Sequence, residues 1–353
     1  MTTYPVWGWS RDPRDEPSRT DLEAMAPLVA DHLGLAVQAP ETPAALPELP
    51  ADRVGGRLPA ALASLASSDP VDRARHALGR SYRDVVRGIR GWLDAVPDAV
   101  LRPAGESDVV AVLEWCSDAG VAVVPYAGGT SVAGGVEPAV GDGFAGVVSL
   151  DLERLAGVRE VDPVSRAARV AAGTPGPRLE DDLRPHGLTA RFFPQSFERS
   201  TVGGWVATRA AGHFSSRLTH IDDIVESVRA VTPSGVWESR RLPGSGAGPS
   251  PDRMLLGCEG SLGVVTETWL RVQPRPAHRW AATLAAESFA AGAHAVRELM
   301  HDGLLPATCR LVDAAESATT GTLDTGEAAL VLGVESYGGP VDAPARRALE
   351  LAR

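Results

Sequence analysis

The sequence predicts an α+β fold, in which short strands alternate with helices along most of the chain. Three observations carry this prediction. From about residue 99 onward, apolar runs of strand length alternate with amphipathic segments of helix length. A glycine-rich loop directly follows one of these runs, at residues 125–138. After Pro276 the alternation begins again, which indicates the start of a second α+β unit in a chain of 353 residues.

Residues 1–92 are predicted to form a helical and extended N-terminal region. The first 70 or so residues are rich in proline, alanine and acidic residues, and residues 39–50 have the composition of a linker. Apolar periodicity predicts helices over residues 21–32, 72–78 and 82–93.

Residues 93–276 are predicted to form the main domain. Ser107 is a candidate N-cap for a helix that runs through Asp118 and ends at Gly120. A tight turn at residues 233–235 is expected to join two strands. The other expected elements are strands at 121–125, 146–150, 169–171, 226–232 and 264–272, and a helix at 177–185.

Residues 277–353 are predicted to begin a further domain that the chain does not complete. The chain ends inside a helix-like run at 343–353, so we expect a C-terminal portion to be missing. The other expected elements are strands at 280–285, 310–312 and 328–334, and a helix at 289–301.

The composition excludes several kinds of chemistry. The chain has no lysine, so all 34 basic residues are arginine, which excludes a Schiff-base lysine, a Walker lysine and a kinase lysine. The formal net charge of −11 argues against a nucleic-acid partner. Cys116, Cys258 and Cys309 are far apart and odd in number, so we expect no disulfide or metal site and a reducing cytoplasm. No segment is apolar enough to span a bilayer.

The loop at residues 125–138, with the sequence P-Y-A-G-G-T-S-V-A-G-G-V-E-P, is the most informative stretch of the chain. Its glycines let the backbone turn tightly and bring N–H groups close to a ligand. Thr130 and Ser131 add hydroxyl donors, and no acidic residue of the loop precedes Glu137. This combination favours a phosphate site. The spacing fits neither the dinucleotide-fold fingerprint nor the NTPase loop, and the alternative is a glycine-rich surface turn.

Three further blocks follow this loop. They are P-Q-S-F-E-R-S-T-V-G-G-W-V-A-T-R-A-A-G at 194–212, I-D-D-I-V at 221–225 and L-G-C-E-G-S-L-G-V-V-T-E at 256–267. In this order the four blocks resemble the FAD-binding domain of the vanillyl-alcohol oxidase/p-cresol methylhydroxylase (VAO/PCMH) superfamily. The opening W-G-W at 7–9 and the block at 200–212 are most similar to the alkyldihydroxyacetonephosphate synthase (alkylglycerone-phosphate synthase) branch. The resemblance extends to about residue 313 and implies two α+β subdomains that bind FAD, followed by the beginning of a cap domain.

The resemblance also implies which residues contact the cofactor. The loop at 125–131 is expected to hold the pyrophosphate of FAD through backbone N–H groups, and the blocks at 195–201 and 208–211 to run beside the flavin. The block at 259–265 is expected near the ribose and adenine. Arg310 matches a family arginine at the start of the cap domain that is important for activity. The implied cofactor-binding residues are Pro125, Tyr126, Ala127, Gly128, Gly129, Thr130, Ser131, Gln195, Ser196, Phe197, Glu198, Arg199, Ser200, Thr201, Thr208, Arg209, Ala210, Ala211, Glu259, Gly260, Ser261, Leu262, Gly263, Val264 and Val265.

Several of these residues have a structural alternative. Ser200 and Thr208 could serve as capping or turn hydroxyls, and Glu259 could cap a turn. Asp222 and Asp223 are expected to form a turn before a strand rather than to act in catalysis.

Arg310, His213 and His220 are the candidates for contact with a substrate. An arginine in an apolar run needs an anion as its partner, which is either a substrate or a carboxylate. The two histidines flank the flavin blocks, but a single histidine is more often structural or solvated.

The chain departs from the family pattern in two places. Ala127 stands where the family usually has the first of three glycines, which is costly if that residue needs a positive φ and harmless if it does not. The tyrosine acid/base and the histidine-rich stretch of the synthase branch lie beyond the residues present here, and Tyr337 does not match that motif.

The resemblance implies a flavoenzyme that exchanges the acyl group of acyl-dihydroxyacetone phosphate for a fatty alcohol, with flavin N5 as the nucleophile. Two alternatives stay open: an FAD-linked 2-hydroxy-acid dehydrogenase or oxidase of the D-lactate or glycolate type, and a flavin-binding remnant without catalysis. We expect a lipid phosphate or a 2-hydroxy acid as the small-molecule substrate, noncovalent FAD and no metal. Peripheral membrane contact and a homodimer are left open.

Overall fold

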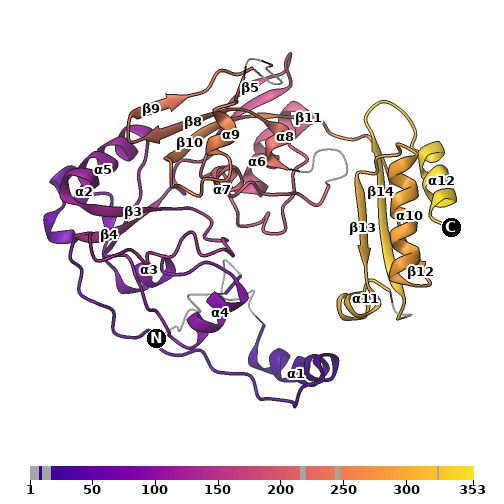
Figure 1. Ribbon diagram of the computed structural model, residues 1–353, viewed down its shortest axis with the longest axis horizontal. Helices are drawn as coiled ribbons and strands as arrows, with labels where there is room; N and C mark the ends of the chain where they lie inside the picture. The colour runs from indigo at the N-terminus through magenta and orange to yellow at the C-terminus, as the bar shows by residue number, and fades with distance from the viewer. Residues whose placement is uncertain (1–7, 10–16, 215–219, 243–245, 247, 324–325) are drawn as a thin grey trace.

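Four β-sheets and the helices packed on them make up the protein in the computed structural model (Figure 1). The structure describes residues 8–9, 17–214, 220–242, 246, 248–323 and 326–353. Trp7 of the W-G-W motif lies outside the described residues. Helices and strands follow one another in each unit, so the predicted α+β fold is confirmed.

The first sheet has the strand order β1-β2-β4-β3, and its inner strands are apolar because both of its faces are covered. Strands β2 and β3 both run parallel to β4, and helix α5 connects β2 to β3. The elements are β1 (Ala66–Ser67), β2 (Ala99–Leu101), α5 (Glu106–Ala119), β3 (Val121–Tyr126) and β4 (Gly146–Asp151).

The two ends of helix α5 can be compared with the predicted N-cap and the predicted C-terminal glycine. Its N-cap is Gly105, so the prediction of Ser107 as the cap is wrong, and Ser107 lies in the first turn. The helix ends at Gly120, which has a φ of 66° and donates to the carbonyl of Cys116, as glycine at a helix end does. The predicted end is therefore confirmed.

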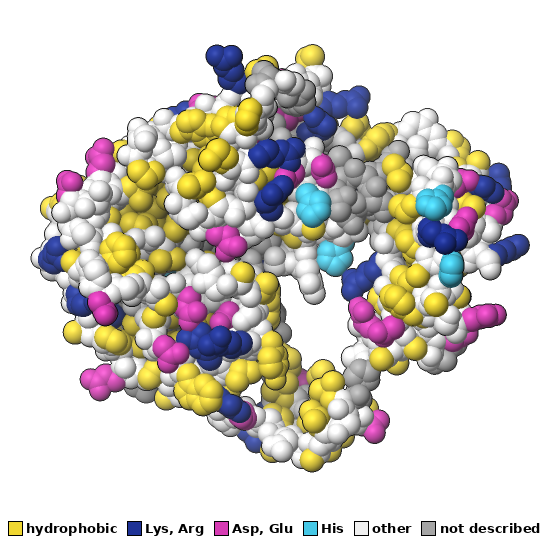
Figure 2. All heavy atoms as spheres, in the orientation of Figure 1, with side chains coloured by type: hydrophobic (Ala, Val, Ile, Leu, Met, Phe, Trp, Pro, Cys, Tyr) yellow, Lys and Arg dark blue, Asp and Glu magenta, His cyan; other side chains and the backbone are white. Residues whose placement is uncertain are grey.

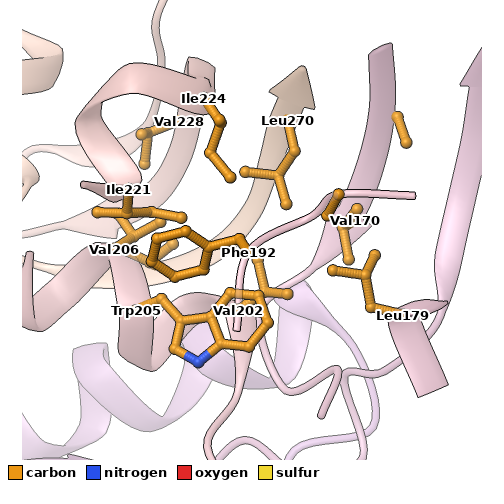
Figure 3. Packing of buried hydrophobic residues seen from close by; sticks show 14 of the residues in the cluster. Val170, Leu179, Phe192, Val202, Trp205, Val206, Ile221, Ile224, Val228 and Leu270 are labelled. Atoms are coloured by element: carbon orange, nitrogen blue, oxygen red, sulfur yellow. The ribbon is translucent and has the colours of Figure 1, made fainter. Parts of the chain in front are cut away.

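The second sheet is antiparallel, with the order β5-β6-β10-β8-β9. Under it lies the largest core, in which Trp205 and Phe192 are almost fully buried and their ring centroids are 5.2 Å apart (Figure 3). The helices α6, α7 and α8 contribute Leu179, Val202 and Ile221 to this core. The elements are β5 (Val158–Asp162), β6 (Ala167–Ala171), α6 (Gly176–Leu183), η3 (Arg184–His186), α7 (Val202–Thr208), α8 (Ile221–Ile224), β8 (Val225–Thr232), β9 (Gly235–Glu238), α9 (Asp252–Leu255) and β10 (Val264–Arg271).

A two-stranded sheet, β7 with β11, leads to the third large sheet, which has the order β12-β14-β13 and lies apart from the first two sheets (Figure 1). Helix α10 packs on this sheet, and Leu299, Leu330 and Leu332 form its small core. Arg191, which follows β7, forms an ion pair with Glu335 on β14. The elements are β7 (Leu188–Thr189), β11 (Gln273–Pro274), β12 (His278–Ala286), α10 (Phe289–His301), β13 (Thr308–Val312), α11 (Ala314–Thr320), β14 (Ala328–Ser336) and α12 (Asp342–Leu351).

In the N-terminal region, polar caps set the starts of helices α3 and α4. The Asp69 side chain accepts from the N–H groups of Val71 and Asp72, and the Ser81 side chain accepts from the N–H group of Asp84. These caps explain why the helix predicted at 72–78 begins two residues earlier. The elements are α1 (Arg19–Leu33), η2 (Gly55–Arg57), α2 (Ala60–Ala63), α3 (Pro70–Arg75) and α4 (Tyr82–Ile89).

Candidate functional site

A cavity of about 370 Å³ lies where the loop after β3 meets helix α7 and the beginning of strand β10. All seven residues of the predicted anion-binding loop line it, together with members of the other predicted cofactor blocks. The predicted residues that line the cavity are Pro125, Tyr126, Ala127, Gly128, Gly129, Thr130, Ser131, Ser196, Ser200, Thr201, Thr208, Ala210, Glu259, Gly260, Gly263, Val264 and Val265.

The glycines of these blocks let four chain segments approach one another closely. A Cβ atom on Gly128 would lie 2.4 Å from the carbonyl oxygen of Arg199, and one on Gly260 would lie 2.8 Å from the Cγ atom of Pro125. Gly129 has a φ of 62°, which other residues adopt at a cost. The loop therefore needs glycine for its own path and for its contacts with the neighbouring segments.

Ala127 does not disturb this arrangement. It is absent from the described non-glycine residues that have a positive φ, which are Arg166, Arg191, Arg209 and Glu259. Alanine at position 127 is therefore harmless, which is the second of the two expectations.

The backbone N–H groups of residues 128–132 are the chemically most informative feature of the cavity wall. Within the described part of the chain, none of these five groups has a hydrogen-bond acceptor. Backbone donors without a protein acceptor bind water or an anion. The cavity wall is thus able to hold a phosphate group without any basic side chain.

The ionisable side chains agree with this description. Among the described residues that line the cavity there is one carboxylate, Glu259, and no arginine or histidine. Tyr126 is buried, and this burial raises the pKa of its phenol. The site therefore presents neutral donors and one negative charge.

Helix α7 is held at both ends by residues of the predicted blocks. Thr201 is its N-cap and accepts from the N–H group of Gly204. At the other end the N–H groups of Gly257 and Glu259 donate to the carbonyls of Val206 and Ala207 at 3.0 and 2.9 Å. The block at 256–267 thereby caps the helix that forms one wall of the cavity.

Two predicted hydroxyls are engaged within the protein. The Ser200 hydroxyl donates to the carbonyl of Ser196 and accepts from the indole N–H of Trp205, both at 2.8 Å. The Thr208 hydroxyl donates to the carbonyl of Gly204 at 2.9 Å. Both hydroxyls thus bond within the protein, which is the structural alternative given above for these residues. Both residues nevertheless line the cavity.

Other predicted residues lie beside the cavity without lining it. Phe197 packs on Trp205 in the core, with ring centroids 6.3 Å apart. Arg209 forms an ion pair with Asp222, which also pairs with Arg253. Burial acts to raise the pKa of Asp222, but the hydrogen bonds from the two arginines lower it overall. The predicted residues outside the lining are Gln195, Phe197, Glu198, Arg199, Arg209, Ala211, Ser261 and Leu262.

The cavity is also lined by residues outside the implied cofactor-binding set. Gly203 and Gly204 lie within the predicted block at 194–212, whereas Leu152 and Ala172 carry no local signal because the packing of the sheets brings them to the cavity. The additional lining residues are Val132, Ala133, Gly135, Val136, Leu152, Ala172, Gly203, Gly204, Trp205 and Ala207.

Arg310 is not brought to this cavity in the structure. It lies on β13, its side chain is 53% exposed, and its guanidinium donates to Glu316 at 2.9 Å. The space-filling view shows open space between the third large sheet and the rest of the molecule (Figure 2). His213 and His220 do not line the cavity either, and Asp223 accepts from the N–H group of His220.

Two features are absent among the described residues. No group of three or more histidine, cysteine, aspartate or glutamate side chains there could hold a metal ion. None of the helices in the described part is long and apolar enough to cross a membrane.

Comparison with known proteins gives the family of the central region. Residues 97–239 match a family described as FAD binding domain. The chain is 34% identical over 245 residues to alkyldihydroxyacetonephosphate synthase from Trypanosoma brucei brucei, and 32% identical over 249 residues to the synthase from Dictyostelium discoideum. These alignments cover 69% and 70% of this chain and 40% of each relative, so the chain spans about two fifths of their length.

Other relatives have redox names. The mitochondrial D-lactate dehydrogenase [cytochrome] of Arabidopsis thaliana is 33% identical over 186 residues, which cover 52% of this chain and 31% of that protein.

The fold is also similar to that of a solved structure. A structure of an alkyldihydroxyacetonephosphate synthase superposes with a TM-score of 0.75 at 28% identity, covering 82% of this chain and 57% of the other.

Proposed function

We propose a function for this chain from the premise that it belongs to the FAD-binding superfamily of the VAO/PCMH type, whose cofactor is FAD. The chain is accordingly an FAD-dependent flavoenzyme of this superfamily. The proposal concerns which residues hold FAD and which reaction follows.

The pyrophosphate of FAD is assigned to the loop at 125–131. The observation that carries this assignment is the row of N–H groups at 128–132, which have no acceptor among the described residues and lie in a cavity wall. A pyrophosphate supplies several acceptor oxygens, and its negative charge suits backbone donors. Glu259, the carboxylate in the lining, is assigned to the ribose side, where hydroxyl groups can donate to it.

The reaction we propose is that of an alkylglycerone-phosphate synthase: an acyl group of acyl-dihydroxyacetone phosphate leaves as a fatty acid and a fatty alcohol replaces it. Bound FAD would supply the nucleophile for this exchange through its N5 atom. The chain has to orient the substrate and exclude water from it. The similarity to several synthases, in sequence and in solved structures, supports this choice.

Arg310 is our candidate for the substrate phosphate. Its guanidinium could bind a phosphate in a bidentate manner. Because its present partner Glu316 is also 45% exposed, a phosphate would replace one solvent-exposed carboxylate rather than a buried ion pair.

A redox reaction is the second candidate. The similarity to D-lactate dehydrogenase and to the glycolate oxidase subunit GlcD favours it, because these relatives share the same FAD-binding region. The anion-binding loop serves either reaction, so the loop does not separate them.

The experiment that tests the proposal is the visible absorption spectrum of the purified full chain, followed by acid release of the chromophore. FAD released by acid in about one equivalent is the expected result. Incubation with acyl-dihydroxyacetone phosphate and a labelled fatty alcohol should then give labelled ether product. Bleaching of the flavin by D-lactate or glycolate would instead support the redox reaction, and a folded chain that takes up no added FAD would contradict both.

A further inference from the structure

A cluster of buried and half-buried charged side chains lies beside Tyr126, the residue that leads into the anion-binding loop. Its members are Asp72, His76, Arg102 and Asp151. The side chains of His76 and Asp151 are almost completely buried. None of the four lines the cavity, and neither the loop assignment nor the proposed reaction uses them.

Two hydrogen bonds hold the His76 ring in place. Its Nδ1 atom lies 2.8 Å from the backbone carbonyl oxygen of Asp72, and its Nε2 atom lies 3.2 Å from Oδ2 of Asp151. A carbonyl oxygen only accepts, so Nδ1 of His76 donates to it. The same Oδ2 atom of Asp151 also accepts from Nε of Arg102 at 3.1 Å. The His76 ring is thus held between the Asp72 carbonyl and the Asp151 side chain.

Ion pairs of Arg102 connect the members of the cluster. Arg102 donates from both terminal nitrogens to the two carboxylate oxygens of Asp72, each at 2.7 Å. Arg102 and the His76 ring thus meet at Asp151, and Glu153 lies 3.3 Å from Nε of Arg102 on its solvent side. Removing one member leaves a buried charge without its partner, which is the costly case.

The cluster reaches the anion-binding loop through Tyr126. The ring of His76 packs on the ring of Tyr126 with centroids 4.2 Å apart, and the Tyr126 hydroxyl donates to the carbonyl of Arg75 at 3.0 Å. This hydroxyl lies against Gly129, because a Cβ atom built on Gly129 would be 2.0 Å from it. The end of helix α3 thereby holds the Tyr126 side chain, and that side chain limits where the backbone of Gly129 can lie.

The next residues of the same N-terminal segment hold the other end of the loop. The N–H group of Arg80 donates to the carbonyl of Ser131 at 2.8 Å. A Cβ atom on Gly79 would lie 2.2 Å from that carbonyl oxygen, so the two segments are in close contact.

We propose that His76 is a positioning residue for the anion-binding loop and acts through Tyr126. The proposal rests on the proposed function, because it takes the loop as the site of the FAD pyrophosphate. A row of backbone donors binds an anion well only when it is fixed before binding. The N–H groups of 128–132 have no acceptor in the described protein, so no hydrogen bond of their own fixes them. Their positions therefore depend on packing against neighbouring side chains such as that of Tyr126.

The test compares three variants of the full chain with the wild type. His76→Phe keeps a ring against Tyr126 and removes both ring nitrogens with their hydrogen bonds. Tyr126→Phe keeps the ring and removes the bond to the Arg75 carbonyl. His186→Ala, on the exposed η3 helix, is the control. Circular dichroism and thermal unfolding of the flavin-free proteins establish that each variant is folded.

Binding is measured with FAD, with ADP as a probe that has the pyrophosphate but no flavin, and with riboflavin, which has no phosphate. We expect His76→Phe to raise the Kd for both FAD and ADP by roughly tenfold or more, since it removes both hydrogen bonds that hold the ring beside Tyr126. Riboflavin binding and the His186→Ala protein should stay within about twofold of the wild type. Tyr126→Phe should show the same selective loss, by roughly threefold to tenfold.

The outcomes separate this inference from the proposed function. If the wild type takes up FAD and a folded His76→Phe protein binds FAD and ADP with wild-type affinity, the inference is overturned and the proposed function stands. If His76→Phe does not fold, Tyr126→Phe decides: unchanged ADP binding in that folded protein overturns the route through Tyr126. If the wild type binds neither FAD nor ADP, both proposals are overturned.

Discussion

The loop after β3 and strand β13 are both predicted to bind an anion, and they differ in what supplies the positive charge. In the loop the donors are backbone N–H groups at residues 128–132, held between neighbouring chain segments. On β13 the donor is the side chain of Arg310, which is 53% exposed and paired with Glu316. The positions of the loop donors are set by the path of the backbone, whereas the position of the Arg310 guanidinium depends on its partner.

This difference has a physical cause. A backbone site is fixed by φ angles and by close packing, for which glycine is the requirement at Gly128 and Gly129. A side-chain site on a long, flexible arginine is fixed only by its partners. We therefore expect substitutions in the loop to act on cofactor binding and substitutions of Arg310 to leave it unchanged.

The largest effect is expected for Gly129→Val. A β-branched residue at a φ of 62° is strained by about 1–2 kcal/mol, and its Cβ atom would overlap the Tyr126 hydroxyl at a cost of about 1–3 kcal/mol. If the loop moves to relieve this strain and this overlap, its N–H groups are displaced and FAD affinity falls by roughly two orders of magnitude. Flavin content after purification and titration with FAD measure the loss.

Gly143→Val is the matched control for this substitution. Gly143 is exposed and does not have a positive φ, and no neighbouring atom lies within 4 Å of the position that a Cβ atom would take. This variant should retain wild-type FAD content. Stoichiometric FAD in a folded Gly129→Val protein would contradict the assignment of the loop.

A smaller effect, on folding stability, is expected when the pH is lowered, because Asp72 belongs to the charged cluster beside Tyr126. Burial acts to raise the pKa of Asp72, but hydrogen bonds from Arg102 and the positive charges of Arg102 and His76 lower it below its ordinary 3.8. A carboxylate with a lowered pKa in the folded state stabilises the fold above about pH 4, and this stabilisation is lost as the pH falls through the folded pKa.

Asp72→Asn should therefore lower the free energy of unfolding at pH 7 by about 1–3 kcal/mol. Its Tm should also fall less than that of the wild type between pH 5 and about pH 3. Asp118→Asn, at an exposed residue of α5, is the control and should follow the wild type. Identical acid dependence in the Asp72→Asn and wild-type proteins would show that this carboxylate does not stabilise the fold.

The contrast between the two sites also explains what the sequence could predict. The loop residues 125–131 and the order of the four blocks are local features, and all seven loop residues line the cavity. Strand and helix positions with strong periodicity, such as α10 (Phe289–His301), were likewise predictable.

Contacts between distant segments could not be read in this way. His76 and Asp151 are 75 residues apart, and no spacing rule connects them. The pairing of Arg310 with Glu316 depends on how helix α11 packs at the end of β13. The cap of α5 was missed for a more local reason, since glycine carries no side-chain signal at an N-cap.

The smallest effect on folding and on the cofactor is expected for Arg310→Ala. An ion pair between side chains that are 53% and 45% exposed contributes on the order of 0–1 kcal/mol, so Tm and FAD affinity should stay close to the wild type. If Arg310 holds the substrate phosphate, KM for the phosphate substrate should rise by roughly tenfold or more, because a charge-assisted bidentate contact is lost. Glu316→Gln removes the competing carboxylate and should lower KM or leave it unchanged. Loss of FAD from Arg310→Ala would show that β13 supports the cofactor site after all, and the two anion sites would then not be independent.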